Sequence, residues 1–260
     1  MIKVGFIGAG DIAYLHGEGV QASSNAQLHG IWNRTRTKAE EKASLFDTRV
    51  FDTAEELIEA VDVVYVLTNM ETHHAYCMQA IEAGKHVLVE KPTAVTIEEI
   101  EEIKAFAHQK GVQVAPVHNY IYEAPVMRAK ELIESGKLGD LVSLHVLYNI
   151  HHPEEVAARY PGVIRQILTH HAYCTLYLVG QPELVSCMKA TVNDGSVPQE
   201  NLAMVTMKMR NQALSHLCAS FAADDHAGDP WTFMIKVIGT KGATRYSYRD
   251  WVENTPAVVH

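Results

Sequence analysis

The sequence predicts an α/β fold with two parts: a doubly wound parallel sheet first, then an α+β unit built on a mostly antiparallel, open sheet. In the first part, short apolar runs alternate with helical segments as far as residues 112–116, the pattern of a parallel sheet covered by helices. After residue 180, apolar runs follow one another across turn signals without helices between them. The 260 residues suffice for two domains, which we place at 1–118 and 119–260.

The composition is that of an ordinary globular protein, with 47% hydrophobic and 20% charged residues. A net charge of -9 argues against a nucleic-acid partner, because phosphates would be repelled. The four cysteines are far apart and form no Cys-x-x-Cys pair, so neither a disulfide framework nor a zinc site is indicated. No apolar leader follows Met1 and no uncharged run is long enough to span a membrane, so we expect a cytoplasmic protein without a membrane partner.

The first functional signal is a glycine-rich turn between the apolar run 3–7 and a segment with apolar residues at helical spacing. Gly8 permits a tight turn, Gly10 lets the backbone approach a pyrophosphate, and Ala13 lets the helix lie close to the strand. The unpaired N–H groups of the helix then face an anion. Such turns also occur for packing alone, but a position after a strand and before a helix favours a Rossmann dinucleotide site. The residues expected at the pyrophosphate are Gly8, Gly10, Asp11, Ile12 and Ala13.

The second strand, 27–32, ends where a dinucleotide domain usually places an acidic residue on the ribose. This chain has Asn33 and Arg34 there instead. Asn33 and Thr35 can donate hydrogen bonds to a 2′-phosphate, and Arg34 can pair with that phosphate or stack on adenine. We therefore expect NADP(H) to be preferred over NAD(H). The alternative is that Arg34 and Arg36 are a solvated loop before a helix over 38–46.

The rest of the first domain continues the alternation of strand and helix. Thr53 and Thr96 have the form of helix N-caps. The loop that follows the strand over 62–67 contains Thr68 and His73, and it lies at the carboxyl end of that strand, where such sheets bind ligands. The remaining expected elements are strands over 49–51, 86–89 and 112–116, a helix that starts at Thr53, a helix that follows His74 and ends at Ala83, and a helix from Thr96 to His108.

The block Ala83-Gly84-Lys85-His86-Val87-Leu88-Val89-Glu90-Lys91-Pro92, together with the first turn and the loop ending at His73, resembles the Gfo/Idh/MocA family. Members are NAD(P)-dependent oxidoreductases that mostly act on sugars, inositols and related polyols. The resemblance covers the first domain and extends more loosely to about Gly242. It implies that Lys91 lies beside the nicotinamide and binds and polarises the substrate, while Glu90 and Pro92 shape the loop. An ammonium there can stabilise a developing alkoxide; the alternative is a surface lysine in a loop.

The junction between the domains carries polar and aromatic residues. Similar proteins often have an arginine and a Phe-x-Pro element here, whereas this chain has Tyr122 and Glu123. His118, Asn119 and Tyr122 would suit a polyol or a ring as substrate. Packing between the domains is the equal alternative.

A helix is expected over Val163–Val179, with Gly180 at its C-terminal end. The resemblance implies an Asp and, four residues on, a His that line the substrate pocket; these positions are Gln166 and His170. We expect His170 to be the base that takes a hydroxyl proton. Gln166 cannot take a proton, but it can orient a substrate hydroxyl, so the chemistry is altered if the Asp is essential.

The faces of this helix differ in polarity. Tyr173 shares a face with His170 and either donates a proton or packs. His171 lies on the more apolar stripe, so we expect a core histidine with a satisfied ring. The two stripes are Gln166, His170, Tyr173 and Tyr177, and Ile167, His171, Cys174 and Leu178.

The second sheet is expected from strands over 141–150, 184–191, 201–209, 213–221 and 233–238, with turn signals at 193–195 and 210–212. In the strand 201–209, Leu202 and Met204 lie on one face, and Ala203, Val205, Met207 and Met209 lie on the other. Because both faces are apolar, neither is suited to water. One face should meet the helices of this domain, and the family resemblance implies that the other meets a second subunit. We expect a homodimer or homotetramer through this sheet.

Paired histidines raise the question of a metal site. Adjacent residues point in different directions on a helix and to opposite faces on a strand, so each pair offers one ligand. We expect no metal. The pairs are His73-His74, His151-His152 and His170-His171.

The sequence thus favours an NAD(P)-dependent dehydrogenase or reductase that moves a hydride between nicotinamide and a carbinol carbon of a sugar-like substrate. Two alternatives stay open. One is an enzyme of the same fold that retains its cofactor and eliminates or hydrolyses by transient oxidation, which the missing Asp allows. The other is a non-catalytic NAD(P)-sensing protein that acts through a partner.

Overall fold

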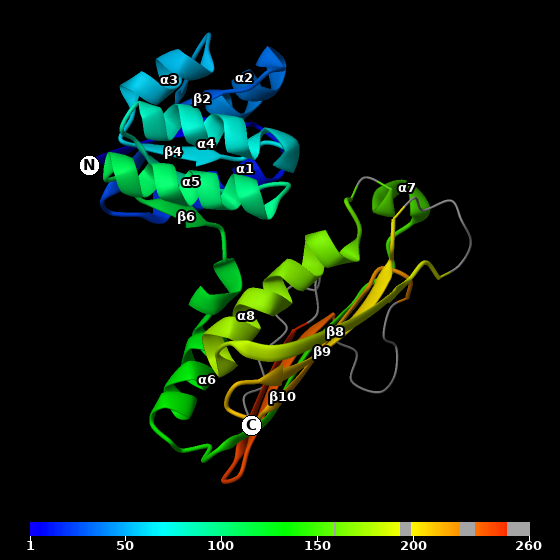
Figure 1. The fold of residues 1–260 in the computed structure, drawn as a ribbon. Helices are drawn as coiled ribbons and strands as arrows, with labels where there is room; N and C mark the ends of the chain where they lie inside the picture. The colour runs from blue at the N-terminus through cyan, green and yellow to red at the C-terminus, as the bar shows by residue number, and fades with distance from the viewer. Residues whose placement is uncertain (159, 193–198, 224–231, 249–260) are drawn as a thin grey trace. The chain divides into compact units, whose positions relative to one another are not determined.

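The computed structural model describes residues 1–158, 160–192, 199–223 and 232–248. The chain divides into two compact units, Met1–Val117 and His118–His260. Each unit is built around its own six-stranded sheet (Figure 1). The boundary expected from the sequence lies one residue further along the chain.

The first unit alternates strand and helix throughout. Its six strands are all parallel and run in the order β3-β2-β1-β4-β5-β6, so the expected doubly wound sheet is confirmed. The strand order reverses between β1 and β4, which places a ligand crevice at the carboxyl ends of these strands. The elements are β1 (Ile2–Ile7), α1 (Ile12–Ala22), β2 (Ala26–Trp32), α2 (Arg36–Leu45), β3 (Arg49–Val50), α3 (Ala54–Ala60), β4 (Val63–Val66), η1 (Met70–Thr72), α4 (His73–Glu82), β5 (His86–Val89), α5 (Ile97–Lys110) and β6 (Val114–Pro116).

The two faces of this sheet have separate cores. Phe6 and Ile7 are neighbours in β1, both fully buried, and belong to different clusters. Phe6 packs with α1 and α2, whereas Ile7 packs with α3, α4 and α5. Helices α4 and α5 lie side by side on their face (Figure 1). Burial on both faces explains why these strands read as continuous apolar runs.

Local signals place the helix ends well. Thr53 Oγ1 accepts a hydrogen bond from the Glu56 N–H, and Thr96 and Glu99 form a reciprocal capping box, so both expected N-caps are confirmed. Helix α2 begins at Arg36 rather than at Lys38. This earlier start is supported by an ion pair of 2.9 Å between Arg36 and Glu40, which are one helical turn apart.

The second unit contains a mixed sheet in the order β12-β11-β7-β10-β9-β8. Only the β7–β10 pair is parallel among these neighbours, so the expected mostly antiparallel sheet is confirmed. Strand β12 and helix α7 were not expected, and the turn signal at 193–195 lies outside the described residues. The elements are η2 (Asn119–Tyr122), α6 (Ala124–Glu134), β7 (Leu141–Asn149), α7 (Glu154–Ala157), η3 (Ile164–Leu168), α8 (Thr169–Val179), β8 (Pro182–Ala190), β9 (Leu202–Met209), β10 (Leu214–Ser220), β11 (Phe233–Gly239) and β12 (Ala243–Tyr248).

The long helix expected over Val163–Val179 is two segments joined end to end. Its first part, η3, is a π-helix, and only α8 has α-helical geometry. The Glu200 carboxylate, far along the chain, accepts a hydrogen bond from the Ile164 N–H where the π-helix starts. This contact is long-range, so helical periodicity in the sequence did not reveal the wider turn.

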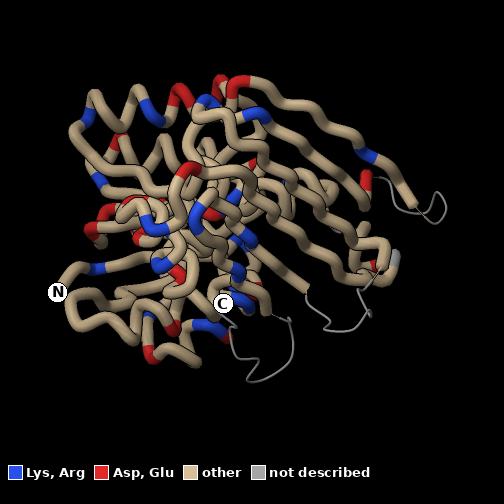
Figure 2. Tube along the Cα trace, turned by 90° about the horizontal axis from the view of Figure 1, so that it is seen from below, with Lys and Arg blue, Asp and Glu red and all other residues tan. Residues whose placement is uncertain are grey.

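Helices α6 and α8 cover one face of the second sheet (Figure 1). In β9 the alternate residues from Ala203 to Met209 are buried against them, and Met204 on the opposite face is 47% exposed. We call this opposite face the outer face; its exposed apolar side chains are Leu184, Met188, Met204 and Leu214. The strands that form it carry few charged residues (Figure 2). The division of β9 into two faces follows the sequence pattern.

His171 lies in the core under α8. Its ring is fully buried, 5.8 Å from the ring of Phe233, and neither ring nitrogen has a hydrogen-bond partner within the described part of the chain. The expected core position is confirmed, but the expected satisfied ring is wrong, because the stripe shared with Cys174 and Leu178 faces apolar side chains. Burial lowers the pKa of His171 to about 3.

This burial predicts a pH-dependent stability. In the unfolded chain His171 has a pKa of about 6.5, so it binds a proton below that pH, whereas the buried ring of the folded chain stays neutral. The free energy of unfolding therefore falls as the pH falls from about 6.5 toward the folded pKa. Between about pH 7.5 and about pH 5, His171→Leu should remove about 2 kcal/mol of the pH-dependent loss in urea denaturation.

The matched control is a leucine substitution at His108, which is exposed on α5. It should keep the wild-type pH dependence. Equal pH dependence in the two variants would contradict the account of His171.

Candidate active site

The turn after β1 is built for close backbone contact. Gly8 has φ 114°, and a Cβ there would lie 2.7 Å from the carbonyl carbon and oxygen of Leu67. By contrast, a Cβ at Gly10 would meet nothing within 4 Å, so space lies open above the turn. Ala13 is fully buried under the turn. The turn therefore offers its backbone to a ligand, as the glycine pattern predicts.

A cleft of about 240 Å³ opens at this turn. It is bounded by the ends of β1, β2 and β4, which is the crevice expected for a doubly wound sheet. Five of the expected cofactor residues line it: Gly8, Gly10, Asn33, Arg34 and Thr68. An open cradle over Gly10 with amide groups and cations around it fits a dinucleotide.

Two positively charged side chains line the cleft at the end where the adenosine of a dinucleotide is expected. Arg34 and Lys38 both line it, whereas Arg36 is paired with Glu40 and Asp52. Lys38 was missed in the sequence; it lies in the first turn of α2, directly after the loop that holds the expected ribose position. Asn33 braces the turn instead of presenting both ends of its amide: its Oδ1 accepts the Ala9 N–H at 3.1 Å, and its Nδ2 donates to the Thr35 carbonyl at 2.9 Å.

His73 is a brace between two loops. It is 1% exposed, with Nδ1 2.8 Å from the Pro92 carbonyl oxygen and Nε2 2.9 Å from the Thr68 carbonyl oxygen. A neutral ring donates to one of these carbonyls and an imidazolium to both. The ring therefore ties the loop after β4 to the loop after β5, and it lies beneath the cleft rather than in its lining.

The loop after β5 is fixed by a second buried contact. Glu90 Oε2 accepts the Lys91 N–H at 2.9 Å, and Glu90 Oε1 lies 2.9 Å from His16 Nε2. The His16 ring meets the rings of Phe6 and Tyr65 edge-on. His16 was missed in the sequence; its place on the inner stripe of α1 with Ala13 and Val20 was the available signal.

Lys91 follows directly in this loop and is partly buried. Burial lowers the pKa of Lys91, and the Glu90 carboxylate beside it acts in the opposite direction. A poorly hydrated ammonium interacts more strongly with a neighbouring oxygen than one in bulk water. A partly buried ammonium at this position is suited to binding a substrate oxygen.

In the second unit, His170 and Tyr173 form a buried cluster with the segment before α6. His170 Nδ1 lies 2.7 Å from the Tyr173 hydroxyl, which also accepts the Tyr120 N–H at 3.2 Å and donates to Asn119 Oδ1 at 3.1 Å. The His118 ring stacks on Tyr173 at 4.2 Å, and the Tyr120 ring stacks on His170 at 4.6 Å. The structure thus brings four expected residues together, His118, Asn119, His170 and Tyr173, and Tyr120 is one that sequence reasoning missed.

Burial shifts the pKa values of two members of this cluster, Tyr173 and His118. Burial raises the pKa of Tyr173, so its phenol keeps its proton, and burial lowers the pKa of His118. A phenol that holds its proton more tightly is a weaker proton donor. Tyr122 is 74% exposed, and Gln166 is partly exposed in the π-helix. Glu123 accepts a hydrogen bond from the Tyr246 hydroxyl, which ties the start of α6 to β12.

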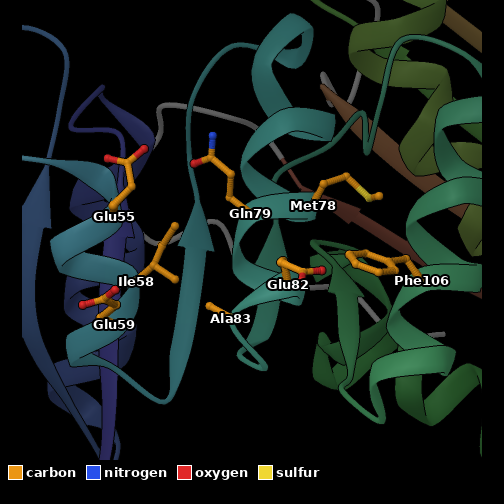
Figure 3. Close-up of a pocket in the computed structure, with 8 residues that line it drawn as sticks. All are labelled: Glu55, Ile58, Glu59, Met78, Gln79, Glu82, Ala83 and Phe106. Atoms are coloured by element: carbon orange, nitrogen blue, oxygen red, sulfur yellow. The ribbon is translucent and has the colours of Figure 1, made fainter.

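A larger groove of about 580 Å³ lies on the helices of the first unit (Figure 3). Its side chains come from α3, α4 and α5, away from the carboxyl ends of the strands. Ile58, Met78 and Phe106 supply apolar surface, and Glu55 and Glu59 are among the carboxylates around it. Because carboxylates repel phosphates, we assign the dinucleotide to the smaller cleft.

Neither a bilayer-spanning helix nor a group of three or more potential metal-ligand side chains occurs in the described ranges.

Two family models match the chain. Residues 2–118 match an oxidoreductase family with an NAD-binding Rossmann fold, and residues 126–245 match the GFO/IDH/MocA C-terminal domain. Among characterised relatives, glucose-6-phosphate 3-dehydrogenase of Bacillus subtilis is 26% identical over 95% of this chain and 74% of its own length. The NADP(+) scyllo-inositol 2-dehydrogenase of Bacillus subtilis is 34% identical over 71% of this chain, but only 54% of its own length is covered.

Solved structures show the same fold. The WlbA dehydrogenase of Bordetella pertussis, in complex with NADH and UDP-GlcNAcA, has a TM-score of 0.84 at 20% identity, covering 95% of this chain and 79% of its own. The apo scyllo-inositol dehydrogenase of Lactobacillus casei has a TM-score of 0.85 at 19% identity, covering 99% of this chain and 77% of its own. The two family matches together span nearly the whole described chain, and the chain therefore belongs to the Gfo/Idh/MocA family of NAD-binding oxidoreductases.

Proposed function

We propose that this protein transfers a hydride between the nicotinamide of NAD(P) and a carbinol carbon of a sugar, inositol or related polyol. The observation that carries the proposal is the pairing, within one unit, of an open glycine turn at the switch point with a desolvated lysine in the loop after β5. Relatives named as glucose-6-phosphate and scyllo-inositol dehydrogenases support the substrate class.

The residues divide the work as follows. The turn from Gly8 to Ala13 holds the pyrophosphate on its amides. When bound, the nicotinamide accepts or supplies the hydride. Lys91 binds the substrate oxygen and stabilises the charge that develops there.

The proton is handled by the second unit. His170 takes the hydroxyl proton as the O–H bond breaks and the carbinol C–H bond releases its electron pair as hydride, and it returns the proton in the reverse direction. Gln166, Tyr173, His118 and Tyr122 are proposed to contact or frame the substrate. His73 and Glu90 are proposed to support the loops that carry Thr68 and Lys91, instead of contacting the cofactor themselves.

The cofactor preference is proposed to be NADP(H). Arg34 and Lys38 place two positive charges at the adenosine end of the cleft, where a 2′-phosphate would lie. Either can pair with a phosphate oxygen.

The protein is proposed to form a homodimer or homotetramer through the outer face of the second sheet. Its four exposed apolar side chains lie on neighbouring strands β8, β9 and β10, which is unusual for a surface left in water.

The catalytic proposal is tested at Lys91. Lys91→Met should lower kcat/KM by about 10²- to 10³-fold on any polyol that the wild type oxidises, with cofactor affinity nearly unchanged, because it removes the donor to the substrate oxygen. Steady-state formation of reduced cofactor and fluorescence titration with NADPH measure the two effects. Lys104→Met, at an exposed position on α5, is the control.

Full activity of Lys91→Met would remove that residue from the chemistry. A wild-type protein that turns over substrate without net cofactor reduction would point to transient oxidation, and one that binds cofactor but turns over no polyol would point to a sensor.

The cofactor preference is tested by titrating the wild type and an Arg34→Ala, Lys38→Ala double variant with NADPH and NADH. Losing both phosphate partners should weaken NADPH binding by about 10- to 100-fold while NADH binding changes little. Arg36→Ala should leave both affinities close to wild type, because that side chain is paired with Glu40 and Asp52. A wild type that binds NADH more tightly would overturn the assignment.

The assembly is tested by sedimentation of Met204→Lys and Met127→Lys. These methionines have similar exposure, 47% and 45%, but Met127 lies on α6 and not on the outer face. A buried lysine at an interface costs several kcal/mol, so Met204→Lys should dissociate the oligomer while Met127→Lys stays associated. A monomeric wild type would refute the proposal.

A further inference from the structure

The cluster around His170 fixes where the hydrogens lie. Tyr173 is 7% exposed and its hydroxyl has three neighbours: the Tyr120 N–H, Asn119 Oδ1 and His170 Nδ1. The backbone N–H of Tyr120 can only donate. The phenol has one hydrogen, and it is directed to the carbonyl oxygen of Asn119.

This leaves the phenol oxygen as an acceptor toward His170. A phenol oxygen has two lone pairs, and the Tyr120 N–H takes one of them. The hydrogen bond of 2.7 Å to His170 Nδ1 then requires the hydrogen to be on Nδ1. In a neutral imidazole with Nδ1–H, the lone pair that accepts a proton is on Nε2.

The rings are held in place as well as the hydrogens. Tyr120 stacks on His170 with an angle of 23° between the ring planes, and His118 stacks on Tyr173 with an angle of 20°. Tyr120 lies in η2, His118 directly precedes η2, and His170 and Tyr173 lie in α8, so the orientation of His170 depends on the contact between this segment and α8. The phenol also keeps its proton, since burial raises the pKa of Tyr173.

We propose that Tyr173, backed by Asn119, is a positioning residue that holds His170 as the Nδ1–H tautomer and so makes Nε2 the nitrogen that exchanges the proton with the substrate hydroxyl. The inference rests on the proposed role of His170 in catalysis. The substrate O–H bond breaks and an Nε2–H bond forms. The imidazolium that results donates its Nδ1–H to an uncharged phenol, which is itself bonded to an amide, instead of to a carboxylate. Tyr173 itself neither gains nor loses a proton.

The tautomer can be read without substrate or cofactor. In protein labelled with ¹⁵N-histidine, at a pH where the ring is neutral, two-bond ¹H–¹⁵N correlations distinguish Nδ1–H from Nε2–H, and a His170→Gln spectrum assigns the signals. The wild type should show Nδ1–H at His170. Asn119→Ala frees the Tyr173 hydrogen to turn toward Nδ1, so this variant should show Nε2–H although the phenol is still present.

The kinetic test uses two tyrosines of one helix. Tyr173→Phe should lose the Nδ1–H preference and lower kcat by about 10- to 100-fold with little change in KM, because the base is populated in the wrong tautomer. Tyr177→Phe, one helical turn further on α8, should match the wild type in both readouts. Thermal unfolding of each variant checks that it is folded.

Nε2–H at His170 in the wild type, or a Tyr173→Phe variant that keeps the wild-type tautomer and kcat, would overturn the inference. The expected tautomer pattern in a protein that turns over no polyol would uphold the positioning of His170 and overturn the proposed function instead.

Discussion

Strand β1 meets the end of β4 at Gly8, and the functional geometry of the first unit depends on this close approach. The residue has a positive φ, and its N–H donates to the carbonyl of Trp32 at the end of β2. A side chain there would collide with the backbone of Leu67. Because three strand ends converge at this residue, the cleft exists only where the chain can turn without a Cβ.

Around this turn, buried polar contacts hold the loops that carry the chemistry. His73 joins the loops after β4 and β5, and Glu90 is held between His16 and the backbone of Lys91. These contacts are made away from water, where an unpaired partner is costly, so the loops have few alternative arrangements. The backbone of the loop that carries Lys91 is therefore held by side chains from α1 and α4 as well as by Glu90.

The second unit solves a similar problem with uncharged groups. His170 contacts the Tyr173 hydroxyl and the stacked Tyr120 ring, and Tyr173 is in turn held by Asn119 and the stacked His118 ring. In the same helix, His171 lies among apolar side chains with neither nitrogen paired within the described residues. Two adjacent histidines thus differ in environment because one faces the polar stripe and the other the core.

Interactions between residues close in the sequence determine much of the secondary structure and the strand pattern of this protein. The glycine turn, the Thr53 and Thr96 caps, the parallel alternation and the two faces of β9 follow from neighbours within a few residues, and the structure agrees with them. Tertiary structure alone decided the rest. His16 meets Glu90 across 74 residues, Tyr173 meets Tyr120 across 53, and Glu200 meets the start of the π-helix across 36. A periodic pattern indicates which face of an element is buried, but which side chain from elsewhere in the chain meets that face, and whether a buried nitrogen finds a partner at all, is set only when the elements pack.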